Sequence, residues 1–434
     1  MEIYALLMFA IVVVVLLLGF PVAFTLGAVA VIFGWIFLGL DIFLALPLRI
    51  WGIMSNYTLL AVPLFVFMGV VLEKSGLAEN LIESIGRAFG RMRGGLAIGT
   101  VLVGTLLAAT TGVVGATVVT MGVIALPTML KYRYSTPIAC GTIAASGTLG
   151  QLVPPSVILI LLGDVVGVSI GDLFLGALVP SLVLVAAFVI YLLVVARRRP
   201  DLLPALESPA DGAMSSLALL RDILPPLLLV LAVLGSIFAG IASPTESAAV
   251  GCLGAILLAG LTRQFSLGKL RDAAEQTTRL TSMVFMILIG ATAFGLVFRG
   301  MGGNSLVQDL LTDLPGARGV FLAAAMLLVF ALGFFLDFIE ICFVVVPILA
   351  PIAQTLGIDL LWFSVLLAVN LQTSFLTPPF GFSLFYLKAV APPEVRIGEI
   401  YRGVLPFVAL QIGVLALVIL FPGLVTWLPR LGAS

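Results

Sequence analysis

The sequence predicts an all-α membrane protein that crosses the bilayer many times and consists of two inverted repeats. Three observations predict this fold: an apolar composition, a pattern that recurs in the second half, and an uneven distribution of basic residues. Of the 434 residues, 62% are hydrophobic and 10% are charged, whereas soluble domains carry about 25% charged residues. A chain of this composition cannot present a water-compatible surface over most of its area.

Composition also excludes several classes of function. The formal net charge is zero, with 21 basic and 21 acidic residues, so no global field favours a nucleic-acid partner. Histidine is absent, which argues against the usual zinc sites, haem-carrying subunits and an enzyme. The three cysteines lie far apart in apolar stretches, as is typical of small buried core residues. The first apolar stretch lacks a basic leader, which predicts an uncleaved spanning helix.

Membrane-spanning helices require about 20 mostly apolar residues. The clear candidates are 3–19, 22–40, 57–72, 173–196, 223–241, 246–262, 281–298 and 404–428. The segments 94–163 and 319–391 are also apolar, but Gly, Pro, Ser and Thr interrupt them. Two amphipathic segments, 77–90 and 303–314, have helical spacing of their apolar residues. We expect them to lie along the membrane interface, the alternative being simple connectors in water.

The second half of the chain repeats landmarks of the first at a nearly constant offset. The shift that brings Pro154-Pro155 onto Pro378-Pro379 also brings Pro127 onto Pro351. A slightly larger shift aligns the segment 170–176 with 397–403. Several landmarks in the same order predict an internal structural repeat.

The basic residues give the expected orientation. If each half has five crossings plus one re-entrant hairpin, the second half is inverted. Four of the 21 Lys and Arg residues then lie on one face and all others on the opposite face. The four are Arg49, Arg299, Arg318 and Arg430. The positive-inside rule makes the richer face cytoplasmic and places both termini on the periplasmic side.

Inverted repeats with broken helices at matching positions are typical of secondary transporters. Proline frees helix carbonyls and glycine lets a ligand approach the backbone, so breaks of this kind suit a hard cation such as Na⁺. Helix N-termini at the same breaks suit a carboxylate. The four candidate segments are the predicted hairpin turns at 110–117 and 333–340 and the predicted breaks at 146–156 and 370–381. The alternatives are structural kinks at the proline pairs and simple helix packing by the hydroxyls.

Three acidic residues in apolar surroundings require separate interpretation. Asp337 and Glu340 are three residues apart at the second predicted turn. Acids within a membrane are costly, which favours a functional role; the alternative is helix capping in trapped water. Glu246 lies at a predicted helix start, where first-turn capping is the favoured interpretation.

At these residues the chain resembles the large membrane subunit of tripartite ATP-independent periplasmic (TRAP) transporters, the DctM-like family. The matching runs are Ser243-Pro-Thr-Glu-Ser-Ala-Ala-Val250, Gly147-Thr-Leu-Gly-Gln-Leu-Val-Pro-Pro-Ser156, Phe335-Leu-Asp337 and Thr377-Pro-Pro-x-Gly381. The resemblance implies an elevator-type architecture of the ion-transporter superfamily, in which a transport domain slides against a scaffold. It also implies a separate small four-helix (DctQ-like) membrane subunit and a periplasmic solute-binding protein as partners.

The resemblance also implies a division of the chain. The first repeat would cover 1–200, with scaffold helices in 1–92 and 173–196 and a hairpin and broken helix in 94–163. A cytoplasmic linker would cover 201–222. The second repeat would cover 223–434, with scaffold helices in 223–317 and 399–428 and a hairpin and broken helix in 319–391.

By motif, two Na⁺ sites and one substrate site are expected at the turns and breaks. The Na⁺ candidates are Thr111, Gly112, Gly115, Gly147, Thr148, Gly150, Gly333, Asp337, Thr373 and Thr377. The substrate candidates are Thr111, Gly112, Gln151, Pro154, Asp337, Glu340, Gln372 and Pro378. The first turn reads Thr-Thr-Gly-Val-Val-Gly, with fewer hydroxyls than the family's usual Ser- and Gly-rich turn.

The expected function is Na⁺-coupled, binding-protein-dependent import of a small organic acid across the bacterial inner membrane, without an organic cofactor. The principal alternative is a stand-alone Na⁺/dicarboxylate symporter of the same fold, which needs no binding protein. A passive channel is a third class, and it would conduct without saturation or coupling.

Overall fold

The computed structural model describes residues 1–89, 92–112, 114–205, 216–261, 266–312 and 316–432, and within them it contains helices and no strand. The helices of the first half are α1 (Glu2–Leu17), α2 (Val22–Leu38), α3 (Leu46–Met54), α4 (Ala61–Lys74), α5 (Leu77–Phe89), α6 (Gly95–Thr111), α7 (Val114–Lys131), α8 (Thr136–Thr148), α9 (Val157–Val166) and α10 (Ile170–Arg198). Those of the second half are α11 (Ser216–Phe238), α12 (Pro244–Leu261), α13 (Leu267–Gly300), α14 (Gly303–Thr312), α15 (Ala317–Leu332), α16 (Phe338–Val344), α17 (Val346–Thr355), α18 (Leu360–Leu376), α19 (Phe382–Val390), α20 (Ile397–Leu420) and α21 (Gly423–Gly432).

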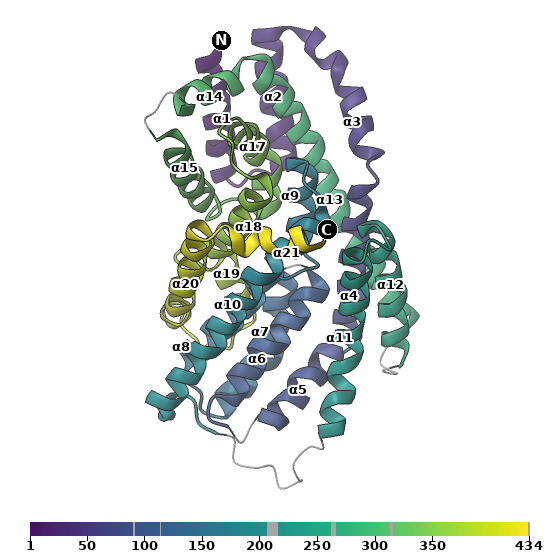
Figure 1. Ribbon diagram of the computed structural model, residues 1–434, viewed down its shortest axis with the longest axis vertical. Helices are drawn as coiled ribbons and strands as arrows, with labels where there is room; N and C mark the ends of the chain where they lie inside the picture. Colours follow the sequence, from purple (N-terminus) through teal and green to yellow (C-terminus); the bar gives the residue numbers. More distant parts are fainter. Residues whose placement is uncertain (90–91, 113, 206–215, 262–265, 313–315, 433–434) are drawn as a thin grey trace.

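The two halves have the same order of elements, which confirms the predicted inverted repeat. In each half, spanning helices precede a short amphipathic helix (α5 or α14), a helical hairpin and a broken helix. The hairpins are α6–α7 and α15–α16–α17, and the broken helices are α8–α9 and α18–α19. Figure 1 shows that α1 begins at the upper end of the molecule and α11 at the lower end, so the second half is inverted.

Proline and glycine end the two broken helices where the sequence predicts. After α8 the chain forms a short 3₁₀ turn, η3 (Leu149–Gln151), and then passes through Pro154-Pro155 before α9 begins. After α18 it passes through Pro378-Pro379 before α19 begins. Both Pro–Pro peptide bonds are cis. Since proline has no N–H to donate, neither helix continues through its break.

The first parts of the two broken helices, α8 and α18, lie in the core of the molecule. Every residue of α18 from Trp362 to Leu376 is buried, as is every residue of α8 from Ile138 to Thr148. Helices that are buried on all sides need no polar face, which explains why neither shows an amphipathic pattern. The first break is buried as well, whereas at the second break Pro379 and Phe380 are exposed.

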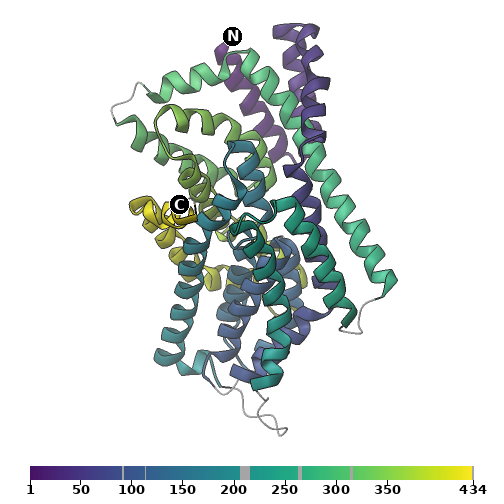
Figure 2. The same cartoon turned by 45° about the vertical axis from the view of Figure 1, so that its right-hand side comes forward.

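Six described helices are long and apolar enough to cross a membrane, and eight spans result if each of two bent helix pairs counts as one. Helices α3 and α4 form one of these bent pairs, and the angle between their two segments is 55°. Its counterpart in the second half is the continuous 34-residue helix α13, which runs diagonally along one side of the molecule in Figure 2. The predicted span 281–298 covers only the apolar half of α13, because its first half is polar.

Two predicted boundaries are wrong. The predicted span 404–428 is two helices, because α20 ends at Leu420 and Pro422 precedes the start of α21. Helix α21 then packs across α10 instead of continuing through the membrane. The predicted linker 201–222 overlaps α11, which begins at Ser216; its residues 206–215 lie outside the described residues, as do Gly90 and 313–314 of the amphipathic segments.

Packing divides the helices into two groups. Helix α2 packs against α13, α13 against α4, α4 against α12, and α12 against α11; we call these five helices the scaffold bundle. Helices α6–α9 and α15–α19 form a second group, the hairpin bundle. The segments 173–196 and 399–428, which were expected in the scaffold, correspond largely to α10 and α20; α10 contacts α21, α6 and α18, and α20 contacts α8, α18 and α10. The division into a scaffold and a transport domain stays a prediction. Helix α5 packs against α6 and α11, and α14 packs against α1, α13 and α15.

Candidate functional site

The first hairpin turns at a glycine in the left-handed region. Gly112 ends α6 with φ 61° and donates its N–H to the carbonyl of Ala108 at 3.0 Å. The hydroxyl oxygens of Thr111 and Thr117 lie 2.8 Å apart across the turn, and both side chains are buried. The remaining turn residue, Val113, lies outside the described residues. The turn therefore presents hydroxyl and carbonyl oxygens within the protein interior.

The first break lies against this turn. A Cβ on Gly112 would lie 3.1 Å from Cγ2 of Val157 and 3.8 Å from the carbonyl oxygen of Pro155. Thr148, at the end of α8, donates its hydroxyl to the carbonyl of Ala145 at 2.8 Å. The Nε2 of Gln411 lies 3.3 Å from the same hydroxyl and donates to it. The polar groups of the first turn and of the first break therefore lie next to each other.

The second hairpin turn is closed by reciprocal capping. The carboxylate of Asp337 accepts the N–H of Phe338 at 2.7 Å, and the carboxylate of Glu340 accepts the N–H of Asp337 at 3.0 Å. The Asp337 side chain also accepts from the backbone N–H of Glu340, and this bond and the Glu340–Asp337 bond together form a capping box at the start of α16. The capping interpretation of the two acids therefore holds, although each carboxylate keeps oxygen lone pairs for a further partner.

The second break supplies a row of threonine hydroxyls. Thr373 donates to the carbonyl of Val369 at 2.8 Å, and Thr377 donates to the carbonyl of Thr373 at 2.7 Å. Because each hydroxyl proton is already used within its helix, each oxygen can still accept or bind a cation. A Cβ on Gly333 would lie 2.1 Å from Oγ of Ser374. Glycine at this position therefore allows the second turn to pack against the second broken helix.

Two buried glutamines at the breaks have no partner within the described part of the chain. Gln151 and Gln372 are both 0% exposed, and neither the Oε1 nor the Nε2 of either side chain is hydrogen-bonded. A buried polar group left unpaired costs about 1–3 kcal/mol. The turn η3, which contains Gln151, packs against α18, which contains Gln372. The two breaks therefore meet in a region that holds unsatisfied amide groups.

A cavity of about 140 Å³ lies in front of the two turns. Gly115 and Val157 come from the first turn and break, Asp337 from the second turn, and Phe375 and Tyr386 from around the second break. The scaffold helices α4 and α13 close the opposite wall, where the buried Oγ1 of Thr281 has no described partner. We call this space the tip cavity. It lies between the scaffold bundle and the hairpin bundle.

Among the described residues, no group of three or more His, Cys, Asp or Glu side chains could hold a metal ion.

Comparison with known proteins decides the family. The family model described as "Tripartite ATP-independent periplasmic transporter, DctM component" matches residues 9–424. The chain belongs to the DctM family. It is therefore the large membrane subunit of a binding-protein-dependent secondary transporter, a multi-pass inner-membrane protein and not an enzyme.

Three DctM-family relatives illustrate the similarity. The C4-dicarboxylate TRAP transporter large permease protein DctM of Pseudomonas aeruginosa is 31% identical over 392 residues, which cover 90% of this chain and 90% of the relative. The sialic acid TRAP transporter large permease protein SiaM of Vibrio cholerae is 30% identical, with 95% of both chains covered. The ectoine TRAP transporter large permease protein TeaC of Halomonas elongata is 30% identical, with 95% of this chain and 96% of the relative covered.

Solved structures show that the DctM-family chain shares its fold with other transporters. The YdaH transporter of Alcanivorax borkumensis superposes with a TM-score of 0.64 at 15% identity, with 96% of this chain and 99% of that chain covered. The MtrF structure of Neisseria gonorrhoeae superposes with a TM-score of 0.60 at 13% identity, with 88% of this chain and 84% of that chain covered. At such low identity the likeness concerns the fold alone.

The structure sorts the predicted site residues of this DctM-family chain into groups. Asp337 and Gly115 line the tip cavity. Other candidates lie behind it in the turns and breaks: Thr111, Gly112, Thr148, Gly150, Gln151, Pro154, Glu340, Gln372, Thr373, Thr377 and Pro378. Gly147 and Gly333 have packing roles, since a Cβ on Gly147 would lie 2.3 Å from Cγ2 of Val118. At these positions the two Na⁺ sites and the substrate site stay predictions.

Three cavity or site residues escaped prediction from the sequence. Tyr386 lies on α19, and its ring carbons are 3.2 Å from the position of a Cβ on Gly115. Thr281 lies where the polar half of α13 meets its apolar half. Gln411 is a polar side chain in an apolar stretch of α20 and is 0% exposed. A polar residue within an apolar membrane segment favours a functional role, and this pattern could have identified Gln411 from the sequence.

Proposed function

We propose that this DctM-family subunit imports a small organic acid by Na⁺ symport, with the solute bound in the tip cavity. The observation that carries the proposal is the tip cavity itself, since its walls come from both turns, from the start of α9 after the first break, from the second broken helix and from the scaffold. Its volume of about 140 Å³ suits a small solute.

Helix N-termini support an anionic solute. Val114, the first residue of α7, and Val157, the first residue of α9, both line the tip cavity. The first N–H groups of a helix have no partner within it, and the helix dipole places partial positive charge there. A carboxylate could bind at these two ends without a basic side chain. The solutes in the names of the relatives, C4-dicarboxylates, sialic acid and ectoine, all carry a carboxyl group.

Oxygen ligands at the breaks support Na⁺ as the coupling ion. Hard cations select carbonyl, hydroxyl and carboxylate oxygens. Thr111 and Thr148 supply hydroxyl oxygens near the first break, and Thr373 and Thr377 supply them near the second. A cation bound beside the cavity would also offset part of the negative charge of the solute.

An elevator movement fits the division into two bundles. The tip cavity lies at their boundary, so sliding of the hairpin bundle along α4 and α13 would carry a bound solute across the membrane. Helix α10 ends in Arg197 and Arg198, and Figure 1 shows this end of α10 toward the lower end of the molecule. We therefore assign the lower end to the cytoplasm and both termini to the periplasmic side. A small four-helix subunit and a solute-binding protein complete the proposed transporter.

Reconstitution tests this function. The chain, its small membrane subunit and its binding protein are assembled in liposomes, and solute uptake is measured with an inward Na⁺ gradient and with K⁺ in its place. We expect uptake in the first case and at least about tenfold less in the second. Equal uptake under both conditions would refute Na⁺ coupling. Uptake without the binding protein would instead favour a stand-alone symporter.

A further inference from the structure

A second cavity lies between the two bundles, nearer the end of the molecule at which the chain begins. It has a volume of about 410 Å³. Its polar wall comprises Arg49 on α3, Asn56 after α3, Asp164 on α9, Arg299 on α13 and Asn304 on α14. Its apolar wall includes Phe294, Phe298, Phe343 and Ile348. A mostly apolar pocket with a few polar groups of fixed position is typical of a small-molecule site.

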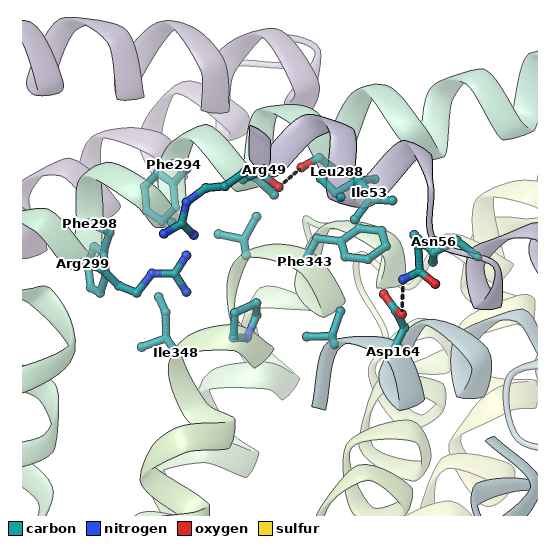
Figure 3. A pocket seen from close by; sticks show the side chains of 18 of the residues that line it. Arg49, Ile53, Asn56, Asp164, Leu288, Phe294, Phe298, Arg299, Phe343 and Ile348 are labelled. Carbon is teal, nitrogen blue, oxygen red and sulfur yellow. Dashed lines mark hydrogen bonds between the residues drawn. The ribbon is translucent and has the colours of Figure 1, made fainter. Parts of the chain in front are cut away.

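The two arginines converge on this space from different helices. Figure 3 shows the side chains of Arg49 and Arg299 extending toward the interior of the cavity. Within the described part of the chain, neither guanidinium forms an ion pair or a hydrogen bond with a protein group. Gly295 lies one turn before Arg299, and a Cβ there would lie 3.6 Å from an Nη atom of Arg299. The absence of a side chain at Gly295 leaves room for the guanidinium.

The one carboxylate on the wall is already engaged. Asp164 accepts a hydrogen bond of 2.6 Å from the Nδ2 of Asn56, as drawn in Figure 3. The cavity therefore holds two positive groups that repel each other and one negative group that pairs with neither. A bound anion would relieve the repulsion, and the fork of donors on a guanidinium matches a carboxylate.

This cavity is connected with the tip cavity through shared helices. Helix α9 lines the tip cavity at Val157 and the second cavity at Asp164. Seven residues of helix correspond to roughly 10 Å. Helices α13 and α16 also contribute to both walls. The wall of the second cavity at Asp164 thus lies about two helical turns along α9 from the tip cavity, on the side assigned to the periplasm.

We propose that the 410 Å³ cavity is a second anion site, in which Arg49 and Arg299 bind the carboxylate of a small organic acid before it reaches the tip cavity. The ligand class rests on the proposed function. The same oxyanion chemistry could come from a lipid headgroup phosphate, and we commit to the solute because the pocket reaches inward to α9 and α16.

Arginine labelling tests this site without measuring transport. The full chain with its small subunit is placed in phosphatidylcholine nanodiscs and treated with phenylglyoxal, and the rate of modification at each arginine is followed by mass spectrometry. We expect succinate to slow modification of Arg49 and Arg299 but not of Arg318 or Arg430. Dimethyl succinate, which lacks the charges, should protect neither. Equal rates with and without succinate would overturn the proposal.

Variants sharpen the test. Arg49→Gln should raise the succinate concentration that half-protects Arg299 by at least about tenfold, because a charge-assisted pair is lost. Arg49→Lys should give a smaller rise, since it keeps the charge but loses the fork. Arg318→Gln is the matched control and should change nothing. An unchanged rate of modification at Arg430 in each variant shows that the fold is retained.

Two further comparisons distinguish a solute site from a lipid site, and this proposal from the proposed function. Nanodiscs with phosphatidylglycerol test the lipid source: protection by this lipid, with no added effect of succinate, would overturn the solute site. Labelling needs neither Na⁺ nor the binding protein. Failure of Na⁺-dependent uptake would therefore refute the proposed function and leave the labelling result interpretable.

Discussion

Asn56 donates a hydrogen bond of 2.6 Å from its Nδ2 to Oδ1 of Asp164 and so joins the scaffold bundle to α9. The Oδ1 of Asn56 accepts the backbone N–H of Thr58 at 2.9 Å, which orients the amide toward Asp164. Since Asn56 lies in the bend between α3 and α4 and Asp164 lies in the hairpin bundle, the proposed elevator movement has to break this bond. We therefore expect this bond to be present in the conformation described here and absent after the movement.

Exchange of the two side chains tests this bond. Asn56→Asp keeps an acceptor for Thr58 but opposes two carboxylates, so we expect uptake to fall about tenfold, as for loss of a hydrogen bond to a charged group. The double variant Asn56→Asp/Asp164→Asn restores one donor and one acceptor and should recover most of the uptake. A double variant no better than Asn56→Asp alone would contradict the pairing.

Gly69 on α4 allows the scaffold to contact the first hairpin turn. A Cβ at this position would lie 2.4 Å from Cα of Thr111 and 2.8 Å from the carbonyl oxygen of Thr110. Because both neighbours are backbone atoms, neither can move aside without moving the turn. We expect Gly69→Ala to lower the free energy of unfolding by about 1–3 kcal/mol and to slow uptake. Gly27→Ala on α2, where no atom lies within 4 Å of the added carbon, is the control for thermal unfolding and uptake assays.

The parts of the fold that depend on local sequence were predictable. Pro154-Pro155 and Pro378-Pro379 mark both breaks, and the order of the repeated landmarks along the chain is enough to reveal the two halves. The polar first half of α13 concealed a continuous helix, since hydropathy alone detects only its apolar end. The end of α20 at Leu420 was also missed, although Pro422 provides a local signal for it.

The cavities depend on contacts between distant segments. Tyr386 and Thr281 face the same space as Asp337 only because α19 packs against α7 and α13 packs against α16. Arg49 and Arg299 belong to different halves of the chain, and no spacing in the sequence brings them together. The capping role of Glu246 was predictable, because Ser243 lies three residues earlier: Ser243 donates its N–H to the Glu246 carboxylate at 2.8 Å.

Asp337 and Glu246 both cap helices, but only Asp337 lines the tip cavity. Asparagine is as good an N-cap as aspartate, so Asp337→Asn removes the charge and retains the cap. We expect this variant to fold and to lose at least about tenfold of its uptake. Glu246→Gln should keep near-parental uptake, because Glu246 is exposed and pairs with Ser243. Near-parental uptake by both variants would refute a role of Asp337 in the site.

Gln372 allows stability and transport to be separated. Its amide is buried and unpaired within the described part of the chain, so without a ligand it destabilises the protein by about 1–3 kcal/mol. Gln372→Met has a similar volume and no amide. In K⁺ buffer we expect this variant to unfold at a temperature about 2 °C higher than the parent, while its Na⁺-dependent uptake falls at least about tenfold.

Gln411→Met is the matched control for this experiment. The Nε2 of Gln411 donates to Thr148 at 3.3 Å, whereas its Oε1 has no partner within the described part of the chain. Gln411→Met removes this unpaired oxygen but also breaks the bond to Thr148, and we expect the lost bond to dominate and to lower the unfolding temperature in K⁺. Opposite shifts in the two variants would show that the Gln372 amide is reserved for a ligand and the Gln411 amide for structure. If Gln372→Met instead transports normally, the amide serves neither the ion nor the solute, because an apolar side chain cannot replace a ligand to either.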